Sequence, residues 1–95
     1  MTKLATLNKE LLTNTLKSTG NWKEDRYGNF TCDKSGKVYR VKFQDTSFRI
    51  ESKVVHDSGY IKYSWVKIGG GYYKDLSFVE DVVMVAGKKI RKEFF

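Results

Sequence analysis

From Trp22 to the C-terminus, aromatic and β-branched residues alternate with polar ones, and turn-forming residues interrupt them at short intervals. Side chains of a β-strand point alternately to the two faces of a sheet, so a period of two is typical of strands with one buried face. Turn residues occur at 27–29, 33–36, 45–46, 56–59, 69–71 and 87–88. Strands are therefore expected near 29–32, 37–44, 47–55, 60–68, 82–86 and 89–94. Such short connections predict an antiparallel meander.

Residues 4–19 have a helical period instead, because leucines recur at intervals of three and four residues. Leu4, Leu7 and Leu11 form one stripe, which Leu12 and Leu16 widen. Thr6 or Asn8 is a candidate N-cap, and Gly20 suits a left-handed C-terminal position. The sequence thus predicts an α+β fold, in which an N-terminal helix packs on one face of an antiparallel sheet of about five strands.

Length and composition favour a single domain spanning residues 1–95. Hydrophobic residues make up 40% of the chain, enough for a compact core. The longest apolar run, at 82–86, is far shorter than the ~20 residues that cross a bilayer, and the N-terminus lacks the pattern of a signal peptide. One cysteine, Cys32, cannot form an internal disulfide. We therefore expect a cytoplasmic protein without a membrane partner.

The chain has 18 basic and 11 acidic residues, a formal net charge of +7. This bias favours a polyanion or an acidic protein as the partner. The arrangement of the charges on the sheet then decides which surface would carry the contact.

The segment 39–53 predicts a hairpin about Asp45 and Thr46. In that register Phe43 opposes Phe48 and Val41 opposes Ile50 on one face. The other face carries Arg40, Lys42, Arg49 and Lys53, with Glu51 as the single acid.

The next hairpin is expected to close near 57–60. This closure places Ile61, Tyr63 and Trp65 on the apolar face, and Tyr60, Lys62, Ser64 and Val66 on the basic face. The helix has one apolar stripe, so it is expected to cover the apolar face and leave the basic face in water. The residues predicted to be buried are Leu7, Leu11, Val41, Phe43, Phe48, Ile50 and Trp65.

The main functional prediction is non-catalytic binding of nucleic acid, with RNA or single strands favoured over duplex DNA. An open basic sheet offers phosphate contacts, and nearby tyrosines such as Tyr60, Tyr72 and Tyr73 offer stacking surfaces. The predicted contact residues are Arg40, Lys42, Arg49, Lys53, Tyr60, Lys62, Lys88, Lys89, Arg91 and Lys92. An equal alternative is that Tyr72 and Tyr73 divide between core and surface, and the basic run at 88–92 is equally typical of a protected edge strand.

Two other interpretations use the same residues. A protein-binding accessory or inhibitor module would dock on an acidic partner through the same basic face or a sheet edge. An ordinary solvated sheet face would also carry lysine and arginine, although like charges opposite one another, as at Lys42 and Arg49, disfavour pairing.

No pattern in the chain predicts catalysis, a metal or a cofactor. His56 is the only histidine, and metal sites need three or four ligands. A metal-free nuclease with His56 as base is the remaining enzymatic alternative. The run 69–71 lacks the Gly-Lys-Ser/Thr ending of a phosphate loop and is predicted to be a flexible turn. Residues 77–86 are ambiguous: 77–80 fits a capping box, whereas the valines at 82–85 favour the strand that we predict.

Overall fold

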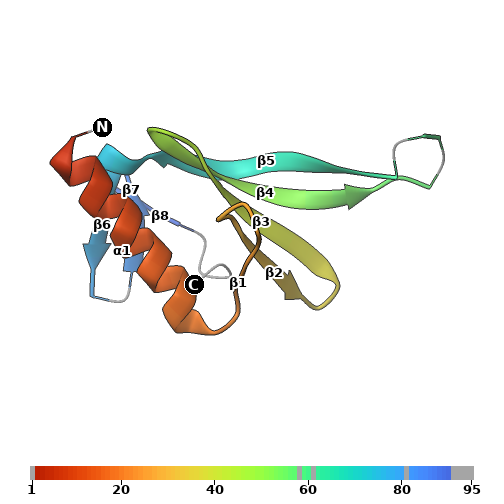
Figure 1. Ribbon diagram of the computed structural model, residues 1–95, viewed down its shortest axis with the longest axis horizontal. Helices are drawn as coiled ribbons and strands as arrows, with labels where there is room; N and C mark the ends of the chain where they lie inside the picture. The colour runs from red at the N-terminus through yellow and green to blue at the C-terminus, as the bar shows by residue number, and fades with distance from the viewer. Residues whose placement is uncertain (1, 58, 61, 81, 91–95) are drawn as a thin grey trace.

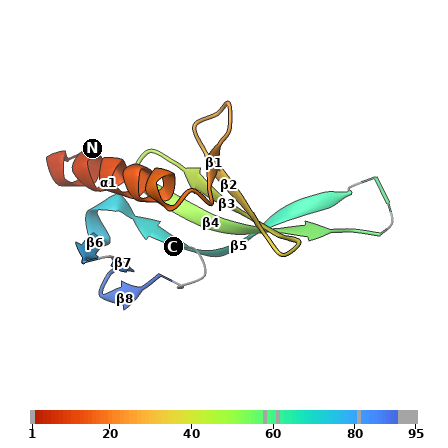
Figure 2. The same ribbon diagram turned by 90° about the horizontal axis from the view of Figure 1, so that it is seen from below.

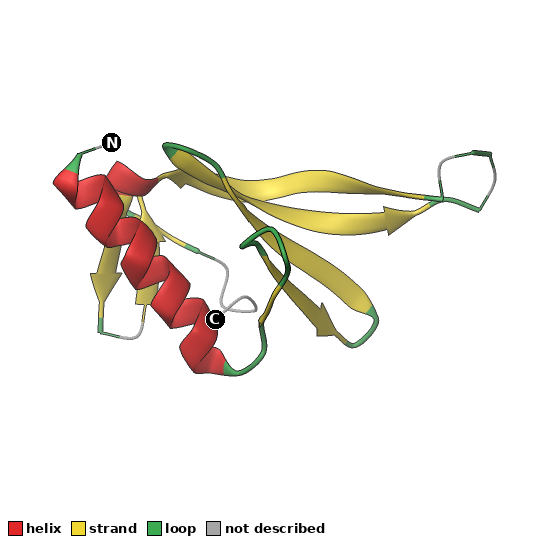
Figure 3. Ribbon diagram, in the orientation of Figure 1, coloured by secondary structure: helices red, strands yellow, loops and turns green. Residues whose placement is uncertain are grey.

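A five-stranded antiparallel sheet and an N-terminal helix form the larger part of the molecule (Figures 1 and 3). The computed structural model describes residues 2–57, 59–60, 62–80 and 82–90. Helix α1 spans Lys3–Thr19. The sheet follows chain order: β1 (Lys23–Glu24), β2 (Phe30–Lys34), β3 (Lys37–Phe43), β4 (Ser47–Val55) and β5 (Tyr63–Tyr72). The predicted α+β fold, with one helix on a five-stranded meander, is confirmed.

Helix α1 begins and ends at residues with the expected chemistry. The N-cap is Thr2, whose side-chain oxygen accepts a hydrogen bond from the Ala5 amide, so neither Thr6 nor Asn8 caps the helix. At the other end, Gly20 adopts the left-handed conformation (φ 73°) that the sequence predicted.

The helix is rotated about its axis relative to the predicted orientation. Ala5, Asn8, Leu12 and Leu16 are buried, whereas Leu7 and Leu11 remain 51% and 39% exposed, so the prediction that these two leucines are buried is wrong. The buried Asn8 explains the rotation. Its amide nitrogen donates to the carbonyl oxygens of Tyr73 (2.8 Å) and Leu76 (3.1 Å), and a buried amide is stable only when its hydrogen bonds are formed.

The register of the β3–β4 hairpin agrees with the prediction at every pair. Phe43 opposes Phe48, Val41 opposes Ile50, and Lys42 opposes Arg49. Val41, Phe48 and Ile50 are buried as predicted. Phe43, which was also predicted to be buried, is only half-buried against the core. Clean alternation of apolar and charged residues specifies such a register, because a slip of one residue would exchange the two faces.

The ends of β4 and β5 extend beyond the rest of the sheet as a two-stranded arm, which we define as residues 53–55 and 63–65. Strand β3 pairs with β4 only as far as Tyr39 and Ser52, whereas β4 pairs with β5 as far as Val55 and Tyr63. This projection, clear in Figures 1 and 2, gives the molecule principal extents of 45 × 26 × 26 Å.

The glycines at 69–71 lie inside β5, so the prediction of a flexible turn there is wrong. Gly70 has φ 128°, and a Cβ on it would overlap the Phe48 carbonyl oxygen. A Cβ on Gly71 would lie 2.5 Å from Cγ1 of Val85. Glycine is therefore required because neighbouring backbone and a second sheet pack directly against this strand. The pairing also shifts here, with Ile50 opposite Gly69 and Glu51 opposite Lys67, which leaves Ile68 as the extra residue of a bulge.

The second sheet follows a single turn of 3-10 helix, η1 (Tyr73–Asp75). It contains β6 (Leu76–Val79), β7 (Val82–Val85) and β8 (Lys88–Lys89) in chain order. The predicted strand over 82–86 is confirmed. Residues 77–80 do not open a helix, because Ser77 and Phe78 pair with Met84 and Val83 in β6–β7.

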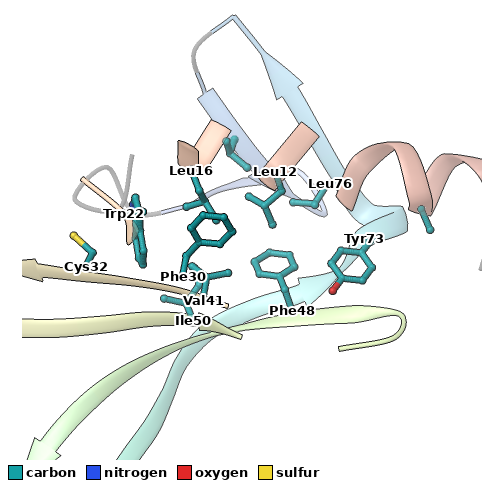
Figure 4. Packing of buried hydrophobic residues seen from close by; sticks show 12 residues of the cluster. Leu12, Leu16, Trp22, Phe30, Cys32, Val41, Phe48, Ile50, Tyr73 and Leu76 are labelled. Carbon is teal, nitrogen blue, oxygen red and sulfur yellow. The ribbon is translucent and has the colours of Figure 1, made fainter. Parts of the chain in front are cut away.

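The core lies between the inner face of the larger sheet, α1 and the second sheet (Figure 4). Its main side chains are Leu12, Leu16, Trp22, Phe30, Val41, Phe48, Ile50, Tyr73, Leu76 and Val83. Tyr73 is fully buried, and its hydroxyl donates to the Gln44 carbonyl at 2.6 Å. Tyr72 stays 55% exposed, so the tyrosine pair divides between core and surface. Both covering elements lie on the inner face, which leaves the opposite face without a layer over it in the described part of the chain.

Candidate nucleic-acid interface

The outer face of the five-stranded sheet gathers basic side chains from four of its strands, β1, β3, β4 and β5. Alternation and register place one residue of each strand in a row across this face: Lys23, Thr31, Arg40, Glu51 and Lys67. Lys42 and Arg49 lie on one side of the row, and Lys53 lies on the other. Asp33 and Glu51 are the acidic residues on this face. The basic residues are Lys23, Arg40, Lys42, Arg49, Lys53 and Lys67. The face therefore carries six basic residues against two acidic ones.

Glu51 lies at the centre of the outer face and is only 4% exposed. Its Oε1 accepts from Nε of Arg40 at 2.8 Å and lies 2.7 Å from Nη2 of the same residue. Its Oε2 lies 3.6 Å from Nη2 of Arg49. A buried carboxylate is tolerated when such partners surround it. Two of the predicted phosphate contacts, Arg40 and Arg49, are thus held in an ion-pair cluster rather than extended freely into water.

Two aromatic side chains lie on the outer face, each beside a cation. The Arg40 guanidinium carbon lies 4.3 Å from the centroid of the Trp65 ring, and Nζ of Lys53 lies 4.4 Å from that of Tyr63. These are cation–π distances. Trp65 is half-buried and Tyr63 is 51% exposed. The prediction that Trp65 and Tyr63 belong to the apolar face is therefore wrong, and so is the burial predicted for Trp65.

The length of the β4–β5 connection explains this change of face. The strands close at Val55 and Tyr63, with residues 56–62 between them, and Lys53 opposes Trp65. A connection one residue shorter or longer would have produced the opposite parity, because each step of one residue exchanges the two faces. Tyr63, Trp65 and Lys67 consequently share the face of Arg40 and Lys53.

In the same register, Lys62 does not lie with the other basic residues that were predicted for the outer face. The His56 amide donates to the Lys62 carbonyl at 2.9 Å. This hydrogen bond continues the pairing of β4 with β5, so that His56 lies opposite Lys62. By alternation from Tyr63, Lys62 belongs to the side of Val54 and Ser64 rather than to the outer face. Tyr60 is fully exposed at the tip of the hairpin. Arg40, Lys42, Arg49 and Lys53 are brought together as predicted, whereas Lys62 is not.

The basic run near the C-terminus is placed elsewhere. Lys88 and Lys89 form β8, which belongs to the second sheet on the inner side. They line a cavity together with Ile50, Gly69 and Val85, and Ile50 is an inner-face residue. Lys88 and Lys89 therefore do not extend the outer face. The predicted contacts Arg91 and Lys92 lie outside the described residues.

The prediction missed Trp65, Tyr63, Lys67 and Lys23 as members of the outer face. Lys67 and the two aromatics depend on the parity of a long connection, for which the sequence has no local signal. The short β1 pairs Lys23 with Thr31, and a two-residue strand is equally difficult to recognise by period.

The remaining reactive groups lie apart from one another. Nε2 of His56 is 3.0 Å from Oγ of Ser64 in the exposed part of the β4–β5 hairpin. Cys32 is buried, and burial raises the pKa of its thiol. Within residues 2–57, 59–60, 62–80 and 82–90 no group of three or more His, Cys, Asp or Glu side chains is arranged to hold a metal ion. In the same part of the chain no helix is long and apolar enough to span a bilayer.

Comparisons with known proteins identify no relative. No protein-family model matches the chain, and neither a curated protein nor a solved structure is significantly similar to it. The functional argument therefore depends on the outer face itself.

Proposed function

We propose that this protein binds single-stranded nucleic acid, RNA or unpaired DNA, through the outer face of its five-stranded sheet. The single observation that carries the proposal is that two cation–aromatic pairs, Arg40–Trp65 and Lys53–Tyr63, lie together on a basic, uncovered sheet face. Proteins that bind single strands combine positive charge for the phosphates with aromatic rings on which bases stack. An ordinary solvated sheet face needs the charges but not the aromatics.

The shape of the molecule favours unpaired strands over a duplex. Within the described part of the chain, α1 is the only helix longer than a single turn, and its inward side is packed on the core. A helix that reads the major groove must present its side chains to the base edges. An open sheet instead offers a broad surface to splayed bases.

Fluorescence anisotropy with labelled single-stranded RNA and DNA tests the proposal. If about four phosphates are neutralised, the slope of log K against log salt is expected to be about −3. Dissociation constants above about 100 μM at low salt would refute the proposal, because even non-specific contacts of this charge bind more tightly. A duplex of the same sequence serves as the comparison, and tighter binding to it would overturn the preference for single strands.

The most informative variant is Lys42→Glu combined with Lys67→Glu. Neither lysine takes part in the Glu51 cluster, whereas changing Arg49 would disturb a half-buried ion pair. Loss of two phosphate contacts is expected to reduce the salt slope by about 1.4 and to weaken binding at low salt more than tenfold. The matched control is Lys3→Glu with Lys17→Glu, which makes the same change in net charge on exposed positions of α1. Equal losses from both pairs would show that binding depends on net charge rather than on the outer face.

A protein partner is the second candidate, and one observation favours it. Leu4, Leu7 and Leu11 form an exposed apolar stripe on α1, which contact with nucleic acid does not require. A protein-binding accessory or inhibitor module could use this stripe together with the basic face against an acidic partner. Retention of a protein from lysate after nuclease treatment would support this candidate, whereas loss of all retained material would favour nucleic acid.

A further inference from the structure

The central carboxylate of the outer face fixes one cation in a defined orientation. Nε and Nη2 of Arg40 both lie within 2.8 Å of Oε1 of Glu51. The side chain of Glu51 is 5% exposed and that of Arg40 is 21% exposed. A paired contact of this kind limits the guanidinium to one plane. Glu51 therefore does more than reduce the positive charge of the face.

The orientation imposed by Glu51 brings Arg40 onto Trp65. The guanidinium carbon lies 4.3 Å from the indole centroid, although the two residues are on strands separated by β4. An arginine without its carboxylate would sample many rotamers and would lose this freedom only on binding. Holding the group in place beforehand reduces the entropy lost when a ligand binds.

We infer that Arg40 and Trp65 form a stacking subsite for one unpaired base and that Glu51 is its positioning residue. Bases stack on arginine planes as well as on aromatic rings, and both groups are present here at stacking distance from each other. This inference rests on the proposed function and adds to it the residue that organises the site. It also predicts that neutralising Glu51 weakens the binding of single strands, whereas simple charge attraction predicts that it strengthens their binding.

Replacing Glu51 by glutamine separates the two explanations. The variant has nearly the same shape but gains one unit of net positive charge. If Glu51 only opposes phosphate binding, single strands bind Glu51→Gln more tightly than the parent protein. If Glu51 positions Arg40, they bind it more weakly, by about five- to tenfold, because stacking of one base contributes a factor of about five or more to affinity.

Trp65 supplies a second readout that a purely structural role would not change. In a Trp22→Phe background Trp65 is the remaining tryptophan, since the chain has two. A base that stacks in the subsite is expected to quench Trp65 fluorescence at saturation. Glu51→Gln is expected to reduce this quenching, whereas Lys17→Arg, which keeps the charge at an exposed position of α1 outside the outer face, is expected to leave it unchanged.

Arg40→Lys provides an independent variant should Glu51→Gln fail to fold. It preserves the charge but removes the planar fork, so weaker binding and reduced quenching are expected. Protection of the buried Cys32 thiol reports whether each variant is folded. Unchanged or tighter binding by a folded Glu51→Gln or Arg40→Lys, with unchanged quenching, would overturn the positioning role while leaving the proposed function intact. Absence of binding by the parent protein would instead refute the proposed function and this inference with it.

Discussion

Replacing Tyr73 by phenylalanine is expected to change how stability depends on alkaline pH. The phenol is fully buried, and burial raises its pKa from 10.0 to about 12. Asp45 adds to the increase, and the hydrogen bond with the Gln44 backbone opposes it. The folded protein therefore keeps this proton at pH values at which the unfolded chain has lost it. The free energy of unfolding must then decrease as pH rises from 10 through 12.

The size of the effect follows from the two pKa values. The folded-state preference for the neutral phenol is fully present below pH 10, and its loss amounts to about 1.4 kcal/mol at pH 11 and nears 3 kcal/mol above pH 12. At neutral pH, Tyr73→Phe removes the hydrogen bonds with Gln44 and is expected to cost about 1 kcal/mol. The two proteins should therefore become about equally stable near pH 11.

Urea denaturation at pH 7, 9, 10 and 11 measures this convergence. Tyr72→Phe is the matched control, because Tyr72 is the neighbouring residue and is 55% exposed. It should leave the pH dependence of the parent protein unchanged. A constant difference between the parent and Tyr73→Phe from pH 7 to 11 would refute the argument that burial of Tyr73 controls alkaline stability.

Three further predictions concern the core. Asn8→Ala removes the donor to two buried carbonyls and should lower the free energy of unfolding by about 1–3 kcal/mol in urea denaturation; an unchanged midpoint would contradict the anchoring role. Gly70→Ala should abolish cooperative thermal unfolding. Gly36→Ala is also at positive φ, but an added Cβ meets no atom within 4 Å there, so it should cost only about 1 kcal/mol. The thiol of Cys32, 3% exposed and with its pKa raised by burial, should react with a disulfide reagent only when the protein unfolds, and rapid labelling of the native protein would contradict its placement.

The features that the sequence predicted correctly are local. The β3–β4 register follows from strict alternation on both sides of a short turn, since any slip would bury charges. That hairpin also supplies Arg40, Lys42, Arg49 and Lys53, the part of the outer face that was predicted. The helix and its glycine C-cap likewise depend on nearby residues alone.

The tertiary structure decided which side of each element is buried. In α1 the leucine stripe and the true inward side both look apolar, and the hydrogen bonds of Asn8 to residues 65 and 68 positions away select the orientation. In β5 the residues Tyr63 and Trp65 alternate equally well in either register. The length of the connection at 56–62 determines which face they occupy. The arm extends beyond α1 and the second sheet, so no covering element lies there to bury its aromatic side chains. Periodicity in sequence identifies a strand, but only long-range packing determines which of its two faces meets the core.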